Sequence, residues 1–184
     1  MRGLQNVGFV VAGVCLALFA GSFVSGADDK AAEKPGTVTL KVATPQQYAA
    51  TVKAQKGKVV LVDFWGTYCT PCREKFGHTV AISRKYAARG LTVISMACDE
   101  EENHKDALAF LTRQKATFIN LRAAKGTSDE TWDAYEIDSG ALPHYKLYDR
   151  TGKLRHTFTF DAAAKKQFTS DDVEAKVRSL IEEK

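Results

Sequence analysis

Cysteine is scarce in this chain, and the few cysteines that are present exclude two kinds of site. There are four in 184 residues, and Cys15 lies in an apolar N-terminal stretch, which leaves Cys69, Cys72 and Cys98 for the rest of the chain. Three cysteines cannot all pair, so a framework of purely structural disulfides is not expected. The C-x-x-C motif at Cys69 also lacks the second such motif or the spaced histidine pair that a structural zinc site commonly needs. No metal site is therefore predicted.

A concentrated positive charge is also absent. The 26 lysines and arginines are scattered among 22 aspartates and glutamates, and the formal net charge is +4. Such a distribution is typical of a solvated surface, so no nucleic-acid partner is predicted. The sequence has no internal repeat, and its length suits one domain together with a targeting segment.

The N-terminus carries a long uncharged run. Arg2 precedes it, Val7–Ala27 contains no charged residue, and small residues stand before Ala27. This pattern predicts that residues 1–26 are a secretory signal peptide. The alternative is an uncleaved N-terminal anchor that tethers the protein to a membrane through residues 7–27, because about 20 apolar residues can span a bilayer. In both cases residues 27–35 form a tether, and residues 36–184 form an exported domain in the periplasm or another extracytoplasmic space.

Alternating hydrophobic patterns predict an α/β fold in this domain. Apolar runs and turn residues mark strands at Thr37–Ala43, Lys58–Trp65, Leu91–Cys98, Thr117–Leu121, Tyr145–Tyr148 and Leu154–Phe160. Helical spacing and capping residues mark helices that run from Thr44, from Cys69 to Arg89, from Asp106 to Gln114, from Thr127 and from Thr169. Strands that alternate with helices and end in a hairpin predict a mixed central sheet covered by helices on both faces.

The motif Cys69-Thr70-Pro71-Cys72 directly follows the strand at Lys58–Trp65 and opens a helix. Two thiols three residues apart on the first helical turn share a face, so they are close enough to form a disulfide. The unpaired N–H groups at the start of a helix favour the thiolate of Cys69, which is the form that attacks disulfides. We therefore expect Cys69 to be the exposed nucleophile and Cys72, one turn into the helix, to be the buried resolving thiol.

Asp63 is the only ionisable residue within the apolar strand before this motif. Burial makes an ionised carboxyl group costly, so a buried Asp63 should have a raised pKa or a polar partner. Exposure at the end of the strand is the alternative.

The segment from Asp63 to Cys72, together with Gly140-Ala141-Leu142-Pro143, resembles the thioredoxin superfamily, and in particular its exported members of the TlpA and ResA kind. The resemblance implies a thioredoxin-like fold in which Asp106–Leu121 is an extra helix–strand insertion. It implies that Pro143 is cis and faces the dithiol, and that Asp63 exchanges a proton with Cys72. Members of the ResA kind often carry asparagine at the position of Asp63, so a dedicated role in cytochrome c maturation is not implied.

Substrate contacts are expected from residues around the dithiol. These are Trp65, which resembles the tryptophan that packs under the active-site loop, and Tyr68, Thr70, Pro71 and Leu142. The backbone of Leu142, exposed by a cis proline, can pair with an extended substrate chain. Thr70 and Pro71 add no positive charge between the cysteines, unlike the histidine of strongly oxidising members, and this favours a reductase.

The sequence thus predicts a thiol–disulfide oxidoreductase whose only redox group is the Cys69–Cys72 pair, with no cofactor. The resemblance implies disulfide-containing or dithiol proteins as substrates and a separate membrane electron donor. One alternative is a Cu(I) carrier that uses these cysteines and His144, since soft thiolates suit Cu(I), although the C-x-x-x-C spacing of known thioredoxin-fold carriers is absent. Another is a peroxidase, which would want a threonine three residues before the reactive cysteine, whereas Thr67 is two before Cys69. His144 is otherwise read as an ordinary strand side chain, and Cys98 as a small core residue.

Overall fold

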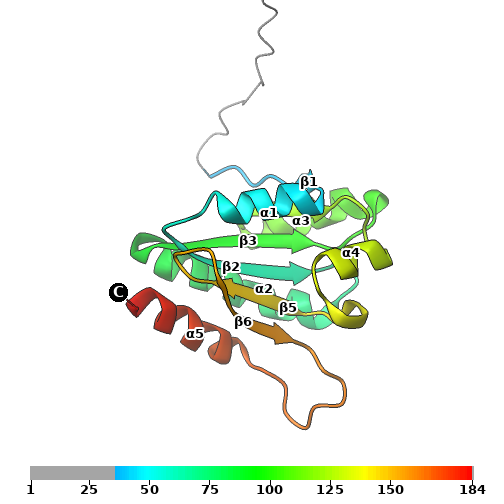
Figure 1. Ribbon diagram of the computed structural model, residues 1–184. Helices are drawn as coiled ribbons and strands as arrows, with labels where there is room; N and C mark the ends of the chain where they lie inside the picture. Colours follow the sequence, from blue (N-terminus) through cyan, green and yellow to red (C-terminus); the bar gives the residue numbers. More distant parts are fainter. Residues whose placement is uncertain (1–35, 184) are drawn as a thin grey trace, which may run out of the picture. The chain divides into compact units, whose positions relative to one another are not determined.

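A computed structural model describes residues 36–183, and the predictions for residues 1–35 lie outside this described part. Six strands form one sheet in the order β1-β4-β3-β2-β5-β6 (Figure 1). The strands are β1 (Lys41–Ala43), β2 (Val59–Trp65), β3 (Leu91–Ala97), β4 (Ile119–Ala123), β5 (His144–Tyr148) and β6 (Leu154–Thr159). The helices are α1 (Pro45–Lys53), α2 (Thr70–Tyr86), α3 (His104–Gln114), α4 (Asp129–Ala134) and α5 (Ser170–Glu182), with short 3₁₀ turns η1 (Ala87–Arg89), η2 (Glu101–Asn103) and η3 (Asp138–Gly140).

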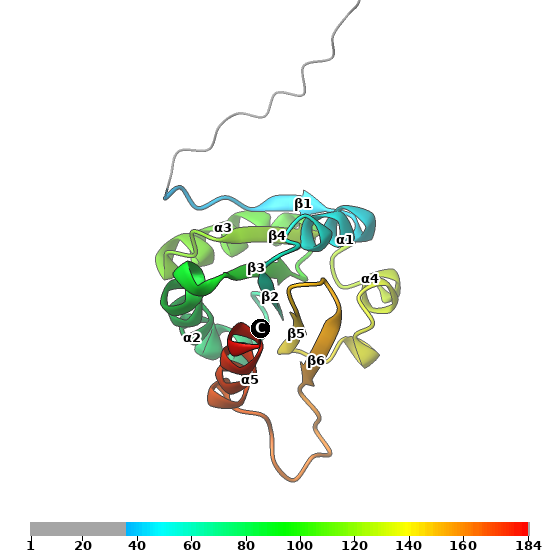
Figure 2. The same cartoon turned by 60° about the vertical axis from the view of Figure 1, so that its left-hand side comes forward.

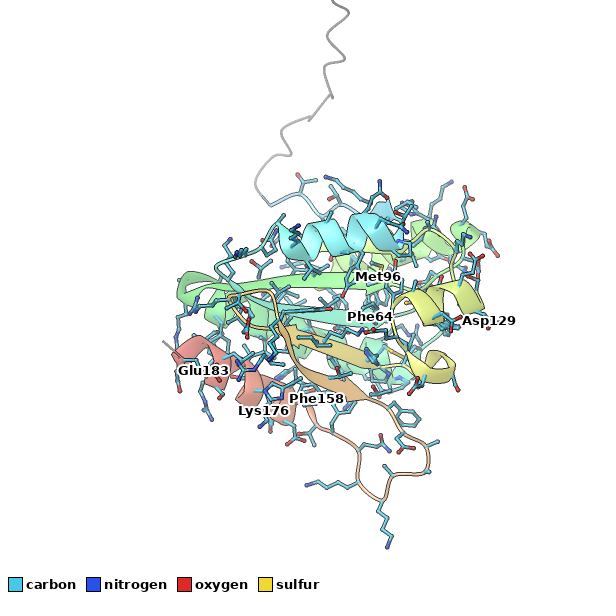
Figure 3. All side chains as sticks on the ribbon, in the orientation of Figure 1. Phe64, Met96, Asp129, Phe158, Lys176 and Glu183 are labelled. Carbon is cyan, nitrogen blue, oxygen red and sulfur yellow. A yellow bond between two sulfur atoms is a disulfide. The ribbon has the colours of Figure 1, made fainter. Side chains whose placement is uncertain are left out.

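The sheet is mixed, as predicted. β1, β4, β3 and β2 are parallel neighbours, whereas β5 runs antiparallel to β2 and β6 antiparallel to β5. Helices α2, α3 and α5 cover one face and α1 and α4 the other (Figure 2). All seven residues of β2 are buried, because a central strand covered on both faces has no solvent side. Phe64 and Met96, paired on β2 and β3, lie in this interior (Figure 3).

Several element boundaries differ from the predicted ones. β1 begins at Lys41 because only Lys41–Ala43 pair with β4. β4 runs on to Ala123, since Arg122 pairs with both β3 and β1 and its side chain is buried. The last strand ends at Thr159, one residue earlier than predicted, and the side chains of Leu154 and Phe160 are exposed, because β6 is an edge strand.

Two local signals act as the sequence indicates. Thr44 caps α1 and forms a capping box with Gln47, whose side chain accepts a hydrogen bond from the Thr44 N–H. Gly90 ends the segment after α2 with a φ of +93°, a left-handed conformation that glycine adopts without strain. Thr44 thus sets the start of α1, and Gly90 sets the turn from the end of the α2 segment into β3.

Candidate active site

Cys69 and Cys72 are joined by a disulfide at the start of α2, with an S–S distance of 2.05 Å. Cys69 is the N-cap residue of the helix, and its Sγ accepts a hydrogen bond from the Cys72 N–H at 3.3 Å. Cys69 is 7% exposed and Cys72 only 1%, which is the order expected for an attacking and a resolving thiol. The prediction that Cys69 is exposed is nevertheless wrong for this oxidised form, because both cysteines are buried. In the reduced state, a negative charge on Cys69 would lie at the positive end of α2, where it is favoured.

A tight turn delivers Cys69 to this position. The Cys69 N–H donates to the Gly66 carbonyl at 3.0 Å, which closes the turn. A Cβ atom on residue 66 would come within 2.6 Å of the Tyr68 ring, so a larger residue there would displace that ring from its position over the turn. Tyr68 itself is 55% exposed, and Thr70 and Pro71 are exposed on the other side of Cys69. These three side chains form the accessible rim of the dithiol.

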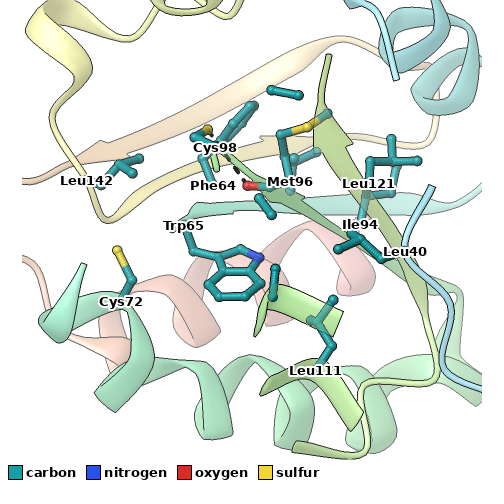
Figure 4. Packing of buried hydrophobic residues seen from close by; sticks show 14 of the residues in the cluster. Leu40, Phe64, Trp65, Cys72, Ile94, Met96, Cys98, Leu111, Leu121 and Leu142 are labelled. Carbon is teal, nitrogen blue, oxygen red and sulfur yellow. Dashed lines mark hydrogen bonds between the residues drawn. The ribbon is translucent and has the colours of Figure 1, made fainter. Parts of the chain in front are cut away.

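Trp65 lies in the protein interior and not at the surface around the dithiol. Its ring is fully buried in the core (Figure 4). It packs against Phe76 of α2 at 5.1 Å and Phe110 of α3 at 4.8 Å between ring centroids. The prediction that Trp65 contacts a substrate is therefore wrong, because the ring has no surface to offer. The Trp65 ring instead packs the end of β2 against helices α2 and α3.

The Leu142–Pro143 peptide bond is cis, as predicted. His144 follows at the start of β5 and is paired with Phe64 of β2, which places Pro143 beside the carboxyl end of β2, where the dithiol turn begins. Leu142 belongs to the same buried cluster as Cys69 and Cys72 (Figure 4). The Cys69–Cys72 segment and the Leu142–Pro143 segment, both singled out in the sequence, thus come together at the carboxyl end of β2.

Asp63 is buried, and the alternative of a solvent-exposed carboxyl is excluded. The Thr79 hydroxyl donates to its Oδ2 at 2.7 Å, whereas Oδ1 is buried and has no hydrogen-bond partner within residues 36–183. Burial raises the pKa of Asp63 to about 7, even though Thr79 and Tyr145, the latter opposite Asp63 on β5, act to lower it. The carboxyl group can therefore take up or release a proton near neutral pH.

His144 is a buried strand residue. Its Nδ1 shares a hydrogen bond with the Thr159 hydroxyl at 2.9 Å, and its Nε2 has no partner in the described part of the chain. Burial, and then the charge of Lys146, lowers its pKa to about 4, so the ring is neutral at physiological pH. No group of three histidine, cysteine or acidic side chains within residues 36–183 is arranged to hold a metal ion, so nothing here brings Cys69, Cys72 and His144 together as a copper site.

The sequence analysis missed one residue that touches the active-site turn. Asp99, two residues after β3, is buried and accepts hydrogen bonds from the backbone N–H and the hydroxyl of Thr67. The available signal was an acidic residue at the carboxyl end of a buried strand that neighbours β2.

Comparison with known proteins gives the same picture. Thiol-disulfide oxidoreductase ResA from Bacillus cereus is 31% identical over 103 residues, which are 56% of each chain. ResA from Bacillus subtilis is 26% identical over 99 residues, 54% of this chain and 51% of that protein. The chain thus matches about half the length of these two relatives.

Among solved structures, a candidate thiol:disulfide interchange protein DsbE from Chlorobium tepidum has a TM-score of 0.57 and 28% identity, and the match covers 70% of this chain and 83% of that one. This similarity confirms the predicted thioredoxin-like fold. The model of the AhpC/TSA family matches residues 34–165, well over half of the sequence. The chain belongs to the AhpC/TSA family.

Proposed function

We propose that this protein is an exported thiol–disulfide oxidoreductase that acts as a reductase of protein disulfides. The observation that carries the proposal is the Cys69–Cys72 disulfide at the start of α2, with the more exposed sulfur at the helix N-cap. The names of the ResA relatives support the same chemistry. The pair itself is the redox group, and no cofactor is required.

The reaction starts from the reduced dithiol. The Cys69 thiolate attacks one sulfur of a substrate disulfide, so a Cys69–substrate disulfide forms and the other substrate sulfur leaves as a thiolate. The Cys72 thiolate then attacks Cys69 Sγ, which forms the Cys69–Cys72 disulfide and releases the second substrate thiolate. Two electrons pass to the substrate. A separate donor of electrons, which we place at the membrane, must reduce the pair again.

Asp63 is proposed to accept the proton of Cys72 in the second step. The nucleophile must be a thiolate, and Cys72 is too buried to lose its proton directly to water. Asp63, with a pKa of about 7, is matched to exchange a proton with a thiol near neutral pH. Its unpartnered Oδ1 is the atom available for that proton, because Oδ2 is engaged by Thr79.

The substrate is proposed to bind as an extended chain across the rim of the dithiol. Tyr68, Thr70 and Pro71 offer exposed surface around Cys69. The loop that carries Leu142 and Pro143 contains the cis bond next to the carboxyl end of β2, and its backbone can pair with a substrate strand. Backbone pairing suits protein substrates of varied sequence, since it uses groups that every chain has.

We place the protein outside the cytoplasm because of its uncharged N-terminal run. Within residues 36–183, none of the helices has both the length and the apolar character needed to cross a bilayer. A retained anchor would be formed by the uncharged residues 7–27. Intact-mass analysis of the protein recovered from its native cell distinguishes a cleaved signal from a retained anchor.

Reduction of insulin by dithiothreitol, followed by turbidity, tests the activity. The wild-type protein should accelerate precipitation, Cys69→Ser should not, and Cys98→Ser should behave as wild type because Cys98 is fully buried and unpaired. A Cu(I) titration and a hydrogen peroxide consumption assay of the reduced protein run beside it. Tight copper binding or rapid peroxide turnover without insulin reduction would replace the proposal by one of the two alternatives.

A further inference from the structure

Asp99 lies next to the dithiol turn because of how β2 and β3 pair. The two strands are parallel, and Trp65 at the end of β2 is in register with Ala97 at the end of β3. The Cys98 N–H extends this ladder by donating to the Trp65 carbonyl at 2.7 Å. The residues that follow both strands therefore emerge side by side, and Asp99 faces the turn that starts at Gly66.

The Asp99 carboxylate takes up both donors of Thr67. The Thr67 N–H lies 2.9 Å from Oδ1 and 3.1 Å from Oδ2, and the Thr67 hydroxyl lies 2.5 Å from Oδ1. Thr67 is an inner residue of the turn that the Cys69 N–H closes on Gly66. The buried Asp99 carboxylate thus fixes this turn at Thr67, two residues before the nucleophile Cys69. Hydrogen bonds to a charged acceptor are stronger than those between neutral groups, so the hold is firm.

The segment that carries Asp99 is itself fixed from the neighbouring strand. Arg122 of β4 is buried, and its Nη1 donates to the Asp99 carbonyl at 3.1 Å and to the Ala123 carbonyl at 3.2 Å. Glu100, the next residue, accepts a hydrogen bond from the Thr127 N–H at 2.8 Å. Asp99 therefore connects the turn before Cys69 to the end of β4 and the loop that leads to α4.

The negative charge of Asp99 also acts electrostatically on groups of the Gly66–Cys69 turn. Burial raises the pKa of Asp99, and then Glu100 raises it further, whereas the hydrogen bonds from Thr67 and the charge of Arg122 lower it. The pKa of the Tyr68 phenol is raised by burial first, and then by Cys98, Asp99 and Glu100. Tyr68 directly precedes Cys69. The Asp99 carboxylate is hydrogen-bonded to Thr67, only two residues before Cys69, so its negative charge lies near the Cys69 thiol. It therefore opposes a second negative charge on Cys69 and counteracts part of the stabilisation that the helix start gives to the thiolate.

We infer that Asp99 is a positioning residue for the dithiol: through Thr67 it holds the Gly66–Cys69 turn, and its charge limits how far Cys69 is ionised. This inference rests on the proposed function, because it assigns a role in the reactivity of the same cysteine. A thiolate that is stabilised less makes the reduced pair less stable, and hence a better reductant. Asp99 thus makes the reduction potential of the Cys69–Cys72 pair more reducing.

Substitutions at Asp99 and Thr67 distinguish the effect of the Asp99 charge from the effect of its hydrogen bonds to Thr67. Asp99→Asn removes the charge but keeps an oxygen that can accept from the Thr67 N–H. Thr67→Val keeps the charge and loses the hydroxyl donor, and Thr67→Ser restores that donor. Asp133→Asn, an exposed acid on α4, is the matched control for loss of one negative charge.

The readout is the rate of alkylation of the reduced protein by iodoacetamide across pH, with the labelled cysteine identified by mass spectrometry. Asp99→Asn should lower the pKa of Cys69 by about half a pH unit, which is about threefold more thiolate at a pH below that pKa. Thr67→Val should leave that pKa closer to wild type but lower kcat for insulin reduction severalfold, and Thr67→Ser should recover kcat. The reduction potential, measured against dithiothreitol, should become less reducing in Asp99→Asn alone.

An unchanged Cys69 pKa and potential in Asp99→Asn, or an equal change in Asp133→Asn, would overturn the role of the charge. A wild-type kcat in Thr67→Val would contradict the claim that Asp99 positions the Gly66–Cys69 turn through Thr67. This variant also tests that claim if Asp99→Asn does not fold. Alkylation does not depend on reductase activity. If the wild-type protein fails to reduce insulin, the proposed function falls, while the Cys69 pKa still decides the role of Asp99.

Discussion

The Thr79 hydroxyl holds one oxygen of Asp63 at 2.7 Å and leaves the other without a hydrogen bond, so the carboxyl group is buried with half of its bonding capacity unused. A group in this state is costly when ionised. Two consequences can be measured, one on stability and one on rate.

Stability should fall as pH rises, by an amount that Asp63 sets. The pKa is about 7 in the folded protein against 3.8 for an unperturbed aspartate, so the folded state binds the extra proton between these values. Folding therefore becomes less favourable from about pH 4 to pH 7, with a full cost on the order of 4 kcal/mol above that range.

Asp63→Asn removes this titration, because the amide keeps the shape and stays neutral. Urea unfolding of the oxidised proteins at pH 5 and pH 8 should show the variant more stable than wild type, and by more at pH 8. The same free energy difference at both pH values would mean that Asp63 is not the titrating group.

The rate consequence concerns the second chemical step. Asp63→Asn removes the proton acceptor proposed for Cys72, so resolution of the mixed disulfide should slow by about 10-fold to 100-fold, which is at or below the low end of the range for general-base catalysis because thiols need less help than hydroxyls. The first attack by Cys69 should change less. Stopped-flow reduction of a fluorescent disulfide between about pH 5 and pH 9, which brackets the carboxyl and thiol pKa values, separates the steps. An unchanged resolution rate would leave Asp63 with a structural role only.

His144 should affect stability in the opposite direction. Its pKa falls from 6.5 to about 4 on folding, so the unfolded chain takes up a proton first as the solution is acidified. The stability due to the neutral buried ring is complete above pH 6.5 and is lost as pH falls towards 4, at most on the order of 3 kcal/mol. In the Asp63→Asn background, which removes the opposing titration, His144→Asn should abolish the remaining loss over this range. A persistent acid loss would assign it to another group.

Substitutions of Trp65 and Tyr68 should have different effects, one on the stability of the fold and the other on substrate binding. Trp65→Ala removes a fully buried ring and should cost about 3–5 kcal/mol of unfolding free energy. Tyr68→Ala removes an exposed ring, so its stability should change little while the KM for a protein disulfide rises. Thermal unfolding and steady-state insulin reduction measure the two effects. A Tyr68→Ala variant with wild-type KM would remove Tyr68 from the proposed substrate rim.

Local sequence patterns were enough to predict the parts of the site that depend on one segment. The position of Cys69 at a helix start and the burial of Asp63 in an apolar strand follow from neighbours in the chain, whereas the cis Leu142–Pro143 bond was implied by the family resemblance. The hold of Asp99 on Thr67 could not be predicted this way, because it depends on the register between two parallel strands.

The place of Trp65 was missed for the same reason. The ring is covered by Phe76 and Phe110, which belong to two different helices, and no pattern near Trp65 shows that a second helix packs there. The extension of β4 to Ala123 likewise depends on pairing with β1, far away in the sequence. Contacts between distant elements decide these details, whereas periodicity decides the elements themselves.

The most direct measurement of the central claim is the capture of a mixed disulfide. Reduced Cys72→Ser protein is mixed with insulin, quenched with acid and digested without reductant, and mass spectrometry identifies the linked peptides. The account predicts a stable covalent adduct through Cys69, which is absent in the Cys69→Ser protein and in the wild-type protein, where Cys72 resolves it. A lack of any adduct, or an adduct through Cys98, would contradict the assignment of Cys69 as the attacking thiol.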